Sequence, residues 1–551
     1  MRTATPQDTK AQRRLPLPIA ERIVAVVLMA AIIFLHLYNH AHAGALWRDE
    51  ANSLGLATMP TLSELWQNFQ FDSVPFVWIS VLRVLHALGV NSDAALRTVG
   101  LGVGLGLLGV FWLNAHQMNC GIPVVSLALV GLSPTIIRWG DCLRAYGLGL
   151  ALMLCTFGLV WKVATSSRRT TFLLATAAAV CSVHTLYYNA VLLFAICSAG
   201  ALLAASHRQW KRSALVLLIG LIAAVSMLVY ADPLRREHEW YVVVLPPSVE
   251  FATLLTRLHE ALSASGGLMA WIWAAAYGAL IAVTVVCLLR PKVLRATREQ
   301  RDLAIYAFAT ALISVVAYAM FLKRLNYIPF PWYYVALMAL TAASMDAGFS
   351  VLRNVPAIRT VQVAASLCVL VLTFFKATEP LKLRLTNVDL IAEALNASAG
   401  DSDYVIVDPW FAGITFQRYY RGLAVWSTLP PIENHRVHRY DKLKEMMSRA
   451  EPVEAVRPIL KTIASTLKSG HKLWLVGYPA FVPPGQAAPS LPPAPYGSMG
   501  WYSPPYQQMW SLKVGEFIQT HALRATHVEV PTLGGVSNYE NLPLVTIEGW
   551  H

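Results

Sequence analysis

The sequence contains few charged residues. Asp, Glu, Lys and Arg make up 14% of its 551 residues, whereas a soluble domain carries about 25%. The chain is also 56% hydrophobic, and its apolar residues come in runs of about 20, the length that crosses a bilayer. This composition argues against a soluble protein and predicts a polytopic α-helical membrane protein.

Signatures of nucleotide and zinc chemistry are missing as well. The sequence has no Walker A loop, no G-x-S-x-G, no H-E-x-x-H and no paired C-x-x-C. Its seven cysteines lack metal-ligand spacing and none follows Cys368, so we interpret them as small apolar core residues. An ATP-driven enzyme and a zinc protease therefore have no support. The first apolar run, Ile23 to Leu37, lacks a convincing cleavage site and predicts a retained span.

The net charge of +13 lies largely in short basic loops, so nucleic-acid binding is not expected. By the positive-inside rule, these loops face the cytoplasm. The basic clusters are Arg13-Arg14 with Arg22, Arg168-Arg169, Arg208 with Lys211-Arg212, Arg290 to Arg301, and Arg353 to Arg359. They predict about eleven spans, a cytoplasmic N-terminus and an outer C-terminus. The expected spans are 20–40, 98–115, 122–138, 146–163, 171–186, 189–205, 213–230, 268–289, 302–321, 332–349 and 359–376. The stretch 75–89 predicts a juxtamembrane or re-entrant amphipathic helix, with a pair of spans as the alternative.

This topology gathers unusual polar residues on the outer face. Asp49 and Glu50 directly follow the first span, and neighbouring carboxylates there can act as a general base or hold a cation. An ordinary solvated acid pair is the alternative. Basic residues on the outer side are disfavoured by the positive-inside rule, so we expect those present to meet an anion. The further candidate site residues are Arg97, Asp141, Arg144, Tyr146, His184, Tyr187, Lys323 and Arg324.

Each of these residues also has a simpler interpretation. Arg97 begins an apolar span and is typical of a snorkelling arginine. Asp141 and Arg144 are three apart and can pair on one helical face. His184 suits a helix end, and the tyrosines suit an interfacial aromatic belt. Lys323 and Arg324, which are flanked by apolar and aromatic residues, fit this simpler view least and suit a lipid phosphate.

From about Lys376 the pattern changes. The segments 400–409 and 471–479 predict strands, and the charged stretch 441–468 between them predicts helix, so a small α/β domain is expected. The predicted division is a transmembrane module, 1–377, whose first outer loop is 41–97, and an outer α/β domain, 378–551. The Pro-rich stretch 481–507 cannot be helical and predicts a flap or surface loop.

The order of these motifs resembles the GT-C membrane glycosyltransferases, in particular the bacterial branch of protein O-mannosyltransferases and the lipid A aminoarabinose transferase. The resemblance is carried over residues 1 to about 200 by Asp49-Glu50, "FDSVPFVWIS", "LGVNSDAALR", "SPTIIRWGDCLRAYGL" and "HTLYYNAVLLF". The sequence departs from the family pattern at Val74, Phe76 and Cys142, where the family has a histidine, a proline and often an acid.

The resemblance implies a GT-C fold and transfer of a sugar from a polyprenyl-phosphate donor to a hydroxyl acceptor on the periplasmic face. Asp49 would be the general base, with inversion at C1, and Glu50 would position the acceptor. Arg97, Arg144, Lys323 and Arg324 would neutralise the donor phosphate. Asp141, Tyr146, His184 and Tyr187 would bind substrate. No cofactor is certain; a divalent metal ion on Asp49 and Glu50 is left open.

The expected location is a bacterial inner membrane, with the C-terminal domain periplasmic and binding or orienting the acceptor. That acceptor is a glycan, a lipid or a protein. A transporter or flippase of a lipid-linked substrate is the main alternative, although the spans contain few deep charges and no evident repeated halves. A membrane-anchored receptor using the C-terminal domain is the third hypothesis, and it leaves the charges of the first loops unexplained.

Overall fold

The computed structural model describes residues 17–551 except 167, 479, 484 and 533. Within this part of the chain, nine helices are long and apolar enough to cross a membrane. They are α1 (Leu17–His42), α5 (Asp93–Gln117), α8 (Tyr146–Thr165), α10 (Asn189–Ser206), α11 (Trp210–Ser226) with its continuation α12 (Ala231–Tyr241), α14 (Leu268–Leu289), α15 (Arg298–Leu325), α16 (Val335–Gly348) with its flanking 3-10 turns η5 (Pro331–Tyr334) and η6 (Phe349–Asn354), and α17 (Pro356–Leu381).

Nine of the eleven expected spans coincide with these helices. The segment expected at 122–138 is interrupted: α6 (Val124–Ser126) passes into a π-helical turn (Leu127–Gly131), and α7 (Pro134–Asp141) starts again at a proline. Proline has no N–H and is tolerated in the first helical turn, which explains the restart. The segment expected at 171–186 is α9 (Arg169–Val183), an apolar helix of 15 residues. The basic pair Arg13-Arg14 lies outside the described residues.

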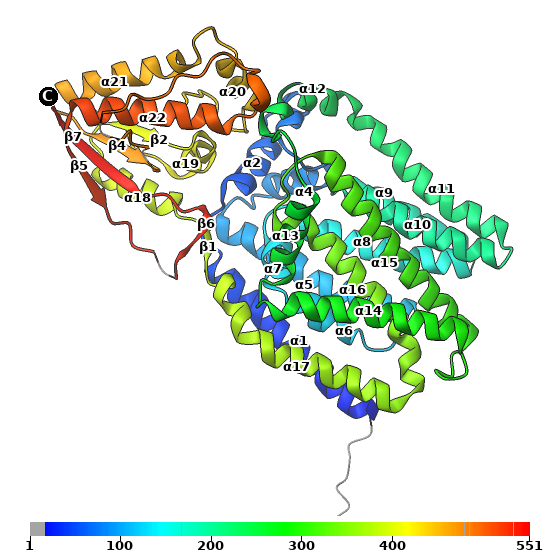
Figure 1. Ribbon diagram of the computed structural model, residues 1–551. Coiled ribbons are helices and arrows are strands. Elements are labelled where there is room, and N and C mark those ends of the chain that lie inside the picture. Colours follow the sequence, from blue (N-terminus) through cyan, green and yellow to red (C-terminus); the bar gives the residue numbers. More distant parts are fainter. Residues whose placement is uncertain (1–16, 167, 479, 484, 533) are drawn as a thin grey trace, which may run out of the picture.

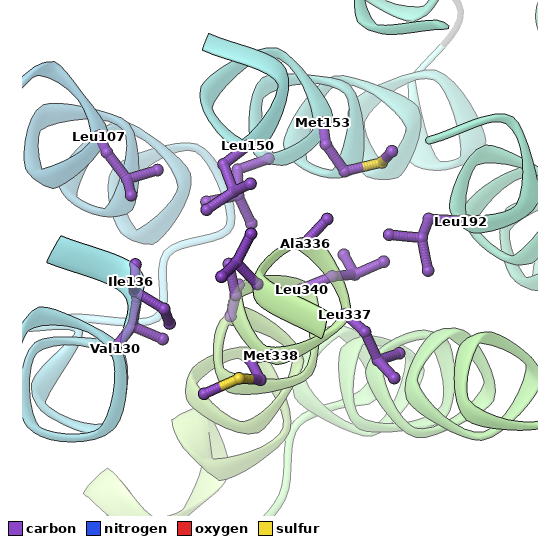
Figure 2. Close-up of a cluster of buried hydrophobic side chains, with 14 of the residues drawn as sticks. Leu107, Val130, Ile136, Leu150, Met153, Leu192, Ala336, Leu337, Met338 and Leu340 are labelled. Carbon is purple, nitrogen blue, oxygen red and sulfur yellow. The ribbon is translucent and has the colours of Figure 1, made fainter. Parts of the chain in front are cut away.

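Helix α16 forms the centre of the helical part. Its apolar window is 100% buried, and its small residues let neighbouring helices approach closely. In Figure 2, Ala336 and Leu340 of α16 lie between Leu150 of α8 and Leu192 of α10, and Leu337 points to another side of the helix. Asp346 near its end accepts hydrogen bonds from the amides of Val125 (3.0 Å) and Ser126 (2.8 Å). This buried carboxylate ties α16 to the interrupted segment.

Four short helices lie between α1 and α5 and in the long connection after α12. They are α2 (Arg48–Ala57), α3 (Leu62–Asn68), α4 (Phe76–Ala87) and α13 (Phe251–Leu262). The stretch predicted as an amphipathic helix is confirmed as helical in α4. Its Arg83 donates to the carbonyls of Ala57 (2.9 Å) and Met59 (2.7 Å). This contact satisfies free carbonyls at the C-terminus of α2 and fixes α2 against α4.

The chain beyond α17 forms two sheets. A five-stranded sheet has the order β3-β2-β4-β7-β5; its first three strands are parallel, and β7 runs antiparallel to β4 and β5. A two-stranded parallel sheet, β1-β6, lies where this part meets the helices (Figure 1). The strands are β1 (Arg384–Thr386), β2 (Tyr404–Val407), β3 (Val425–Thr428), β4 (Leu473–Val476), β5 (Ala522–Val528), β6 (Val536–Glu540) and β7 (Leu544–Trp550).

Helices cover both faces of the larger sheet. Alternate residues of a strand point to opposite faces: Ile406 packs with α20 (Tyr440–Met447), α21 (Arg457–Lys468) and α22 (Pro504–His521), and Val407 packs with α18 (Val388–Ser398) and α19 (Gly413–Tyr419). The predicted strands within 400–409 and 471–479 are confirmed as β2 and β4. The stretch predicted as helix, 441–468, contains most of α20 and all of α21.

One expectation for the Pro-rich stretch 481–507 is wrong. Its last four residues begin α22, because Pro504 and Pro505 occupy the first helical turn, where a missing N–H costs nothing. In the part of this stretch before Tyr502, the described residues contain one short 3-10 turn, Gly497–Met499. The division of the chain at residue 377 stays a prediction.

A buried carboxylate in β6 makes the stability of this region depend on pH. Glu540 is 2% exposed, and burial raises its pKa from 4.5 to about 7. Hydrogen bonds from Thr386 and Thr415 lower this pKa, but by less than burial raises it. The fold therefore favours the protonated acid, and the free energy of unfolding should fall as pH rises from about 4.5 to 7, then level off. We expect Glu540→Gln to raise the apparent Tm at pH 8 and to flatten this profile.

Thermal unfolding scans of the purified protein between pH 4.5 and 8 test this expectation. The exposed Glu451 provides a control, because Glu451→Gln should leave the profile unchanged. A Glu540→Gln profile that follows the wild-type profile would show that Glu540 does not titrate in this range.

Candidate active site

A cavity of about 560 Å³ lies where the helical part meets the C-terminal part. One side of its wall is polar and comes from α2, the 71–74 segment and the start of α8. Another part is mainly aromatic and aliphatic, with Glu237 and His238 among its residues, and comes from the α12 and α15 region. The C-terminal part adds His438 and Tyr440. The polar and tyrosine residues on the wall are Arg48, Asp49, Asn52, Asp72, Ser73, Arg144, Tyr146, Tyr187, Tyr188, Glu237, His238, Tyr241, Tyr327, Tyr333, His438 and Tyr440.

Asp49 lies on this wall, in the first turn of α2. Its Oδ1 is 3.2 Å from Nε of Arg48 and 3.7 Å from Nε2 of His438. Burial raises the pKa of Asp49. Arg48 and the His438 imidazole lower this pKa by more than burial raises it, so the net pKa lies below its usual range. Burial also lowers the pKa of His438. At neutral pH, Asp49 is thus a carboxylate and lies beside the neutral imidazole of His438.

Glu50 points away from the cavity. Its side chain has no exposed surface, and its two oxygens accept from Nη1 (2.5 Å) and Nη2 (2.8 Å) of Arg97. The same carboxylate accepts from the amides of Trp47 (3.1 Å) and Leu143 (2.7 Å). Arg97 completes its bonding with the carbonyls of Gly44 (3.2 Å) and Ala45 (2.6 Å). This pair therefore anchors the start of α2 to α5 and to the turn after α7.

Arg144 reaches the cavity wall but is already paired. Its Nη1 contacts Asp72 at 3.0 Å and donates to the backbone carbonyl of Asp49 at 3.0 Å. The expected pairing of Arg144 with Asp141 is wrong. Helix α7 ends at Asp141, so the two residues do not share a helical face. Asp141 instead binds Nδ1 of His36 at 2.8 Å, away from this cavity.

The other predicted site residues divide into two groups. Tyr146 and Tyr187 line the cavity. His184 ends α9 with both ring nitrogens in hydrogen bonds, to Tyr230 (2.7 Å) and Ser226 (3.0 Å). Lys323 donates to the Val249 carbonyl at 2.5 Å. Arg324 is exposed in the last turn of α15. His184, Lys323 and Arg324 are not on the cavity wall.

The sequence did not identify the contribution of the C-terminal part. His438 lies about 390 positions after Asp49 in the chain, and its amide donates to Asn52 Oδ1 at 2.9 Å. Tyr440 stacks on Trp240 of α12 with a centroid distance of 5.0 Å. No motif in "NHRVHRY" marks these residues; an imidazole close to Asp49 depends on the fold. Arg48, next to the predicted acid pair, could have been selected from its position.

The structure does not bring Asp49 and Glu50 together as a paired cation site, because both oxygens of Glu50 are bound to Arg97 and backbone amides. Within the described part of the chain, no three His, Cys, Asp or Glu side chains are arranged to hold a metal ion. The charged residues on the polar side of the wall are therefore Asp49 beside Arg48, and Asp72 beside Arg144.

Close packing holds the C-terminal segment on α2. A Cβ on Gly55 would lie 2.1 Å from the carbonyl oxygen of Arg436. We expect Gly55→Ala to push this segment off α2, to lower stability by about 1–3 kcal/mol and to reduce activity by moving His438 away from Asp49. Apparent Tm and turnover of the purified variant measure the two effects.

Gly102 of α5 provides the matched control, because a Cβ there meets nothing within 4 Å. Gly102→Ala should be neutral or stabilising by about 0.5–1 kcal/mol. Equal behaviour of the two variants would show that the Arg436 contact does not constrain the site.

Comparison with known proteins gives likenesses of overall structure only. No family model and no curated protein matches the sequence. The chain is similar to ArnT from Cupriavidus metallidurans bound to undecaprenyl phosphate, with 13% identity, coverage of 82% of this chain and 93% of that chain, and a TM-score of 0.48. It is also similar to the oligosaccharyltransferase AglB from Archaeoglobus fulgidus in complex with an inhibitory peptide and a dolichol-phosphate, with 10% identity, coverage of 83% and 69%, and a TM-score of 0.45.

Proposed function

We propose that the protein is a membrane glycosyltransferase that moves a sugar from a polyprenyl-phosphate donor to a hydroxyl acceptor. The observation that carries this proposal is the position of Asp49, an ionised acid on the wall of a large cavity at the end of the membrane helices. The motif order in residues 1 to about 200 supports the same assignment. The cavity wall includes Met227, Phe321 and Leu325, which suit the first isoprene units of a lipid.

In the proposed reaction, Asp49 takes the proton of the acceptor hydroxyl as that oxygen attacks C1 of the sugar. The bond from C1 to the phosphate oxygen breaks on the opposite side, so the anomeric centre inverts, and the transition state has oxocarbenium character. His438 and the Arg144 contact to the Asp49 carbonyl hold the base in place. Tyrosines on the wall present aromatic faces to the sugar ring.

Glu50 and Arg97 act in this proposal through α2 and do not touch substrate. Their buried pair fixes the first turn of the helix that carries Asp49. The acceptor, whether glycan, lipid or protein, is proposed to enter between α2 and the segment that contains His438. The proposed location is a bacterial inner membrane with the cavity on the periplasmic side.

The deciding experiment is transfer of a labelled sugar by the purified full-length protein in detergent. A panel of polyprenyl-phosphate sugars is offered with a pool of cell-envelope acceptors, and a nucleotide-sugar panel serves as the control. Transfer from a lipid-linked donor alone would support the proposal and identify the sugar. Folded protein that transfers from no donor would favour the transporter alternative.

A further inference from the structure

The donors of most cations in and near the cavity are already occupied. Arg97 is bound to Glu50 and to two carbonyls, and Lys323 is bound to the Val249 carbonyl. Arg144 is bound to Asp72, to Ser53 and to the Asp49 carbonyl. These groups stabilise the wall of the cavity and have little capacity left for a ligand.

Arg48 is different. It lines the cavity, and its guanidinium carbon lies 4.6 Å from the ring centroid of Phe411 and 5.3 Å from that of Trp47. Its Nε is 3.2 Å from Asp49 Oδ1, without the geometry of a hydrogen bond. Among the described residues, no hydrogen-bond acceptor is seen for Nη1 or Nη2 of Arg48. The planar group is therefore held by aromatic rings, while its paired donors are free for a ligand.

We propose that Arg48 binds the departing phosphate and that its contact with Asp49 couples the base to the leaving group. This inference rests on the proposed function and deepens it. Before reaction, the charge of Arg48 faces the Asp49 carboxylate. As the acceptor proton moves to Asp49, that carboxylate becomes neutral. The acceptor oxygen bonds to C1, and the electron pair of the C1–O bond leaves on the phosphate, so one negative charge passes from Asp49 to the phosphate.

Arg48 faces the negative charge of Asp49 before the reaction and the added negative charge of the phosphate after it. As Asp49 becomes neutral, Arg48 stabilises the leaving phosphate more strongly. An interaction that strengthens on the way to the transition state accelerates the reaction. A lysine cannot replace Arg48 fully, because an ammonium lacks the planar fork that packs on aromatic rings and binds phosphate with two donors. Phe411 comes from the C-terminal part, so that part sets the position of the cation as well as that of His438.

The test uses purified full-length protein and compares Arg48→Met, Arg48→Lys and wild type. We expect Arg48→Met to lower kcat by about 10²–10³-fold and to raise the inhibition constant of a short-chain polyprenyl phosphate at least tenfold. Arg48→Lys should fall between the two. Arg235→Met removes an arginine whose side chain is 77% exposed and that does not line the cavity, and it should change neither quantity.

A second variant separates coupling from a structural role. Asp49→Asn neutralises the acid without moving Arg48, so it should bind polyprenyl phosphate several-fold more tightly than wild type. The double variant of Asp49→Asn with Arg48→Met should lose that gain. Unchanged or weaker binding by Asp49→Asn, or wild-type binding by Arg48→Met, would overturn the inference. Wild-type protein that transfers no sugar would instead overturn the proposed function.

Discussion

Replacing Asp49 by Asn should lower the rate of sugar transfer by about 10²–10⁴-fold, the usual contribution of a general base. The amide cannot take the acceptor proton, but it keeps the size of the carboxyl group and can occupy the same place beside His438. The main loss should therefore appear in kcat, measured with the labelled lipid-linked donor. The apparent Tm should stay close to that of wild type.

Asp232 offers the control for this substitution. It is an acid on α12 whose side chain is 56% exposed and that does not line the cavity. Asp232→Asn should transfer sugar at the wild-type rate. Equal rates for Asp49→Asn and wild type would keep the enzyme class but remove Asp49 as the base, and Glu237 on the same wall would become the next acid to test.

Replacing Glu50 by Ala should cause the largest loss of stability. Arg97 would be left buried with neither of its carboxylate contacts, and removal of one partner from a buried ion pair costs about 3–5 kcal/mol. The amides of Trp47 and Leu143 would lose their acceptor as well. We expect a large fall in apparent Tm and little folded protein after extraction. Scans at one fixed heating rate are needed, because unfolding of a membrane protein is often irreversible.

The double variant of Glu50→Leu with Arg97→Met tests the cause of this loss. Replacing both charges by apolar side chains removes the uncompensated charge, so it should recover much of the stability. Sugar transfer should stay reduced if the pair also positions Asp49. A double variant as unstable as Glu50→Ala would show that volume and the amide contacts, rather than the charge, explain the loss.

The helical part could largely be predicted from the sequence. A run of about 20 apolar residues has few alternatives to a spanning helix, which explains the agreement for α1, α5 and α14. The structure of the segment 122–138 was harder to predict, because its hydropathy does not indicate that the helix is interrupted before Pro134. The strands β2 and β4 were predictable since each is a short apolar run after turn residues. The start of α22 was missed because Pro504 and Pro505 were treated as breakers rather than as residues of a first turn.

The site could be predicted only where it is local in sequence. Asp49 was selected because it follows a span, and the structure places it on the cavity wall. The prediction of phosphate ligands depended only on the side of the membrane expected for each residue. That side does not reveal that Arg97 and Lys323 already have hydrogen-bond partners. The pairings of Asp141 with His36 and of Asp49 with His438 join residues more than 100 positions apart. Such contacts follow from packing, which no single-sequence pattern encodes.

The strand order of the larger sheet has a consequence for biosynthesis. Strand β7 lies between β4 and β5, and Tyr539, just before it, packs against Trp47 next to the residues of the site. The ribosome produces Asp49 early and these elements last. The nascent protein therefore carries Asp49 without His438 for most of its synthesis, and without β7 until the end. For the proposed glycosyltransferase, sugar transfer should therefore become possible only late in synthesis.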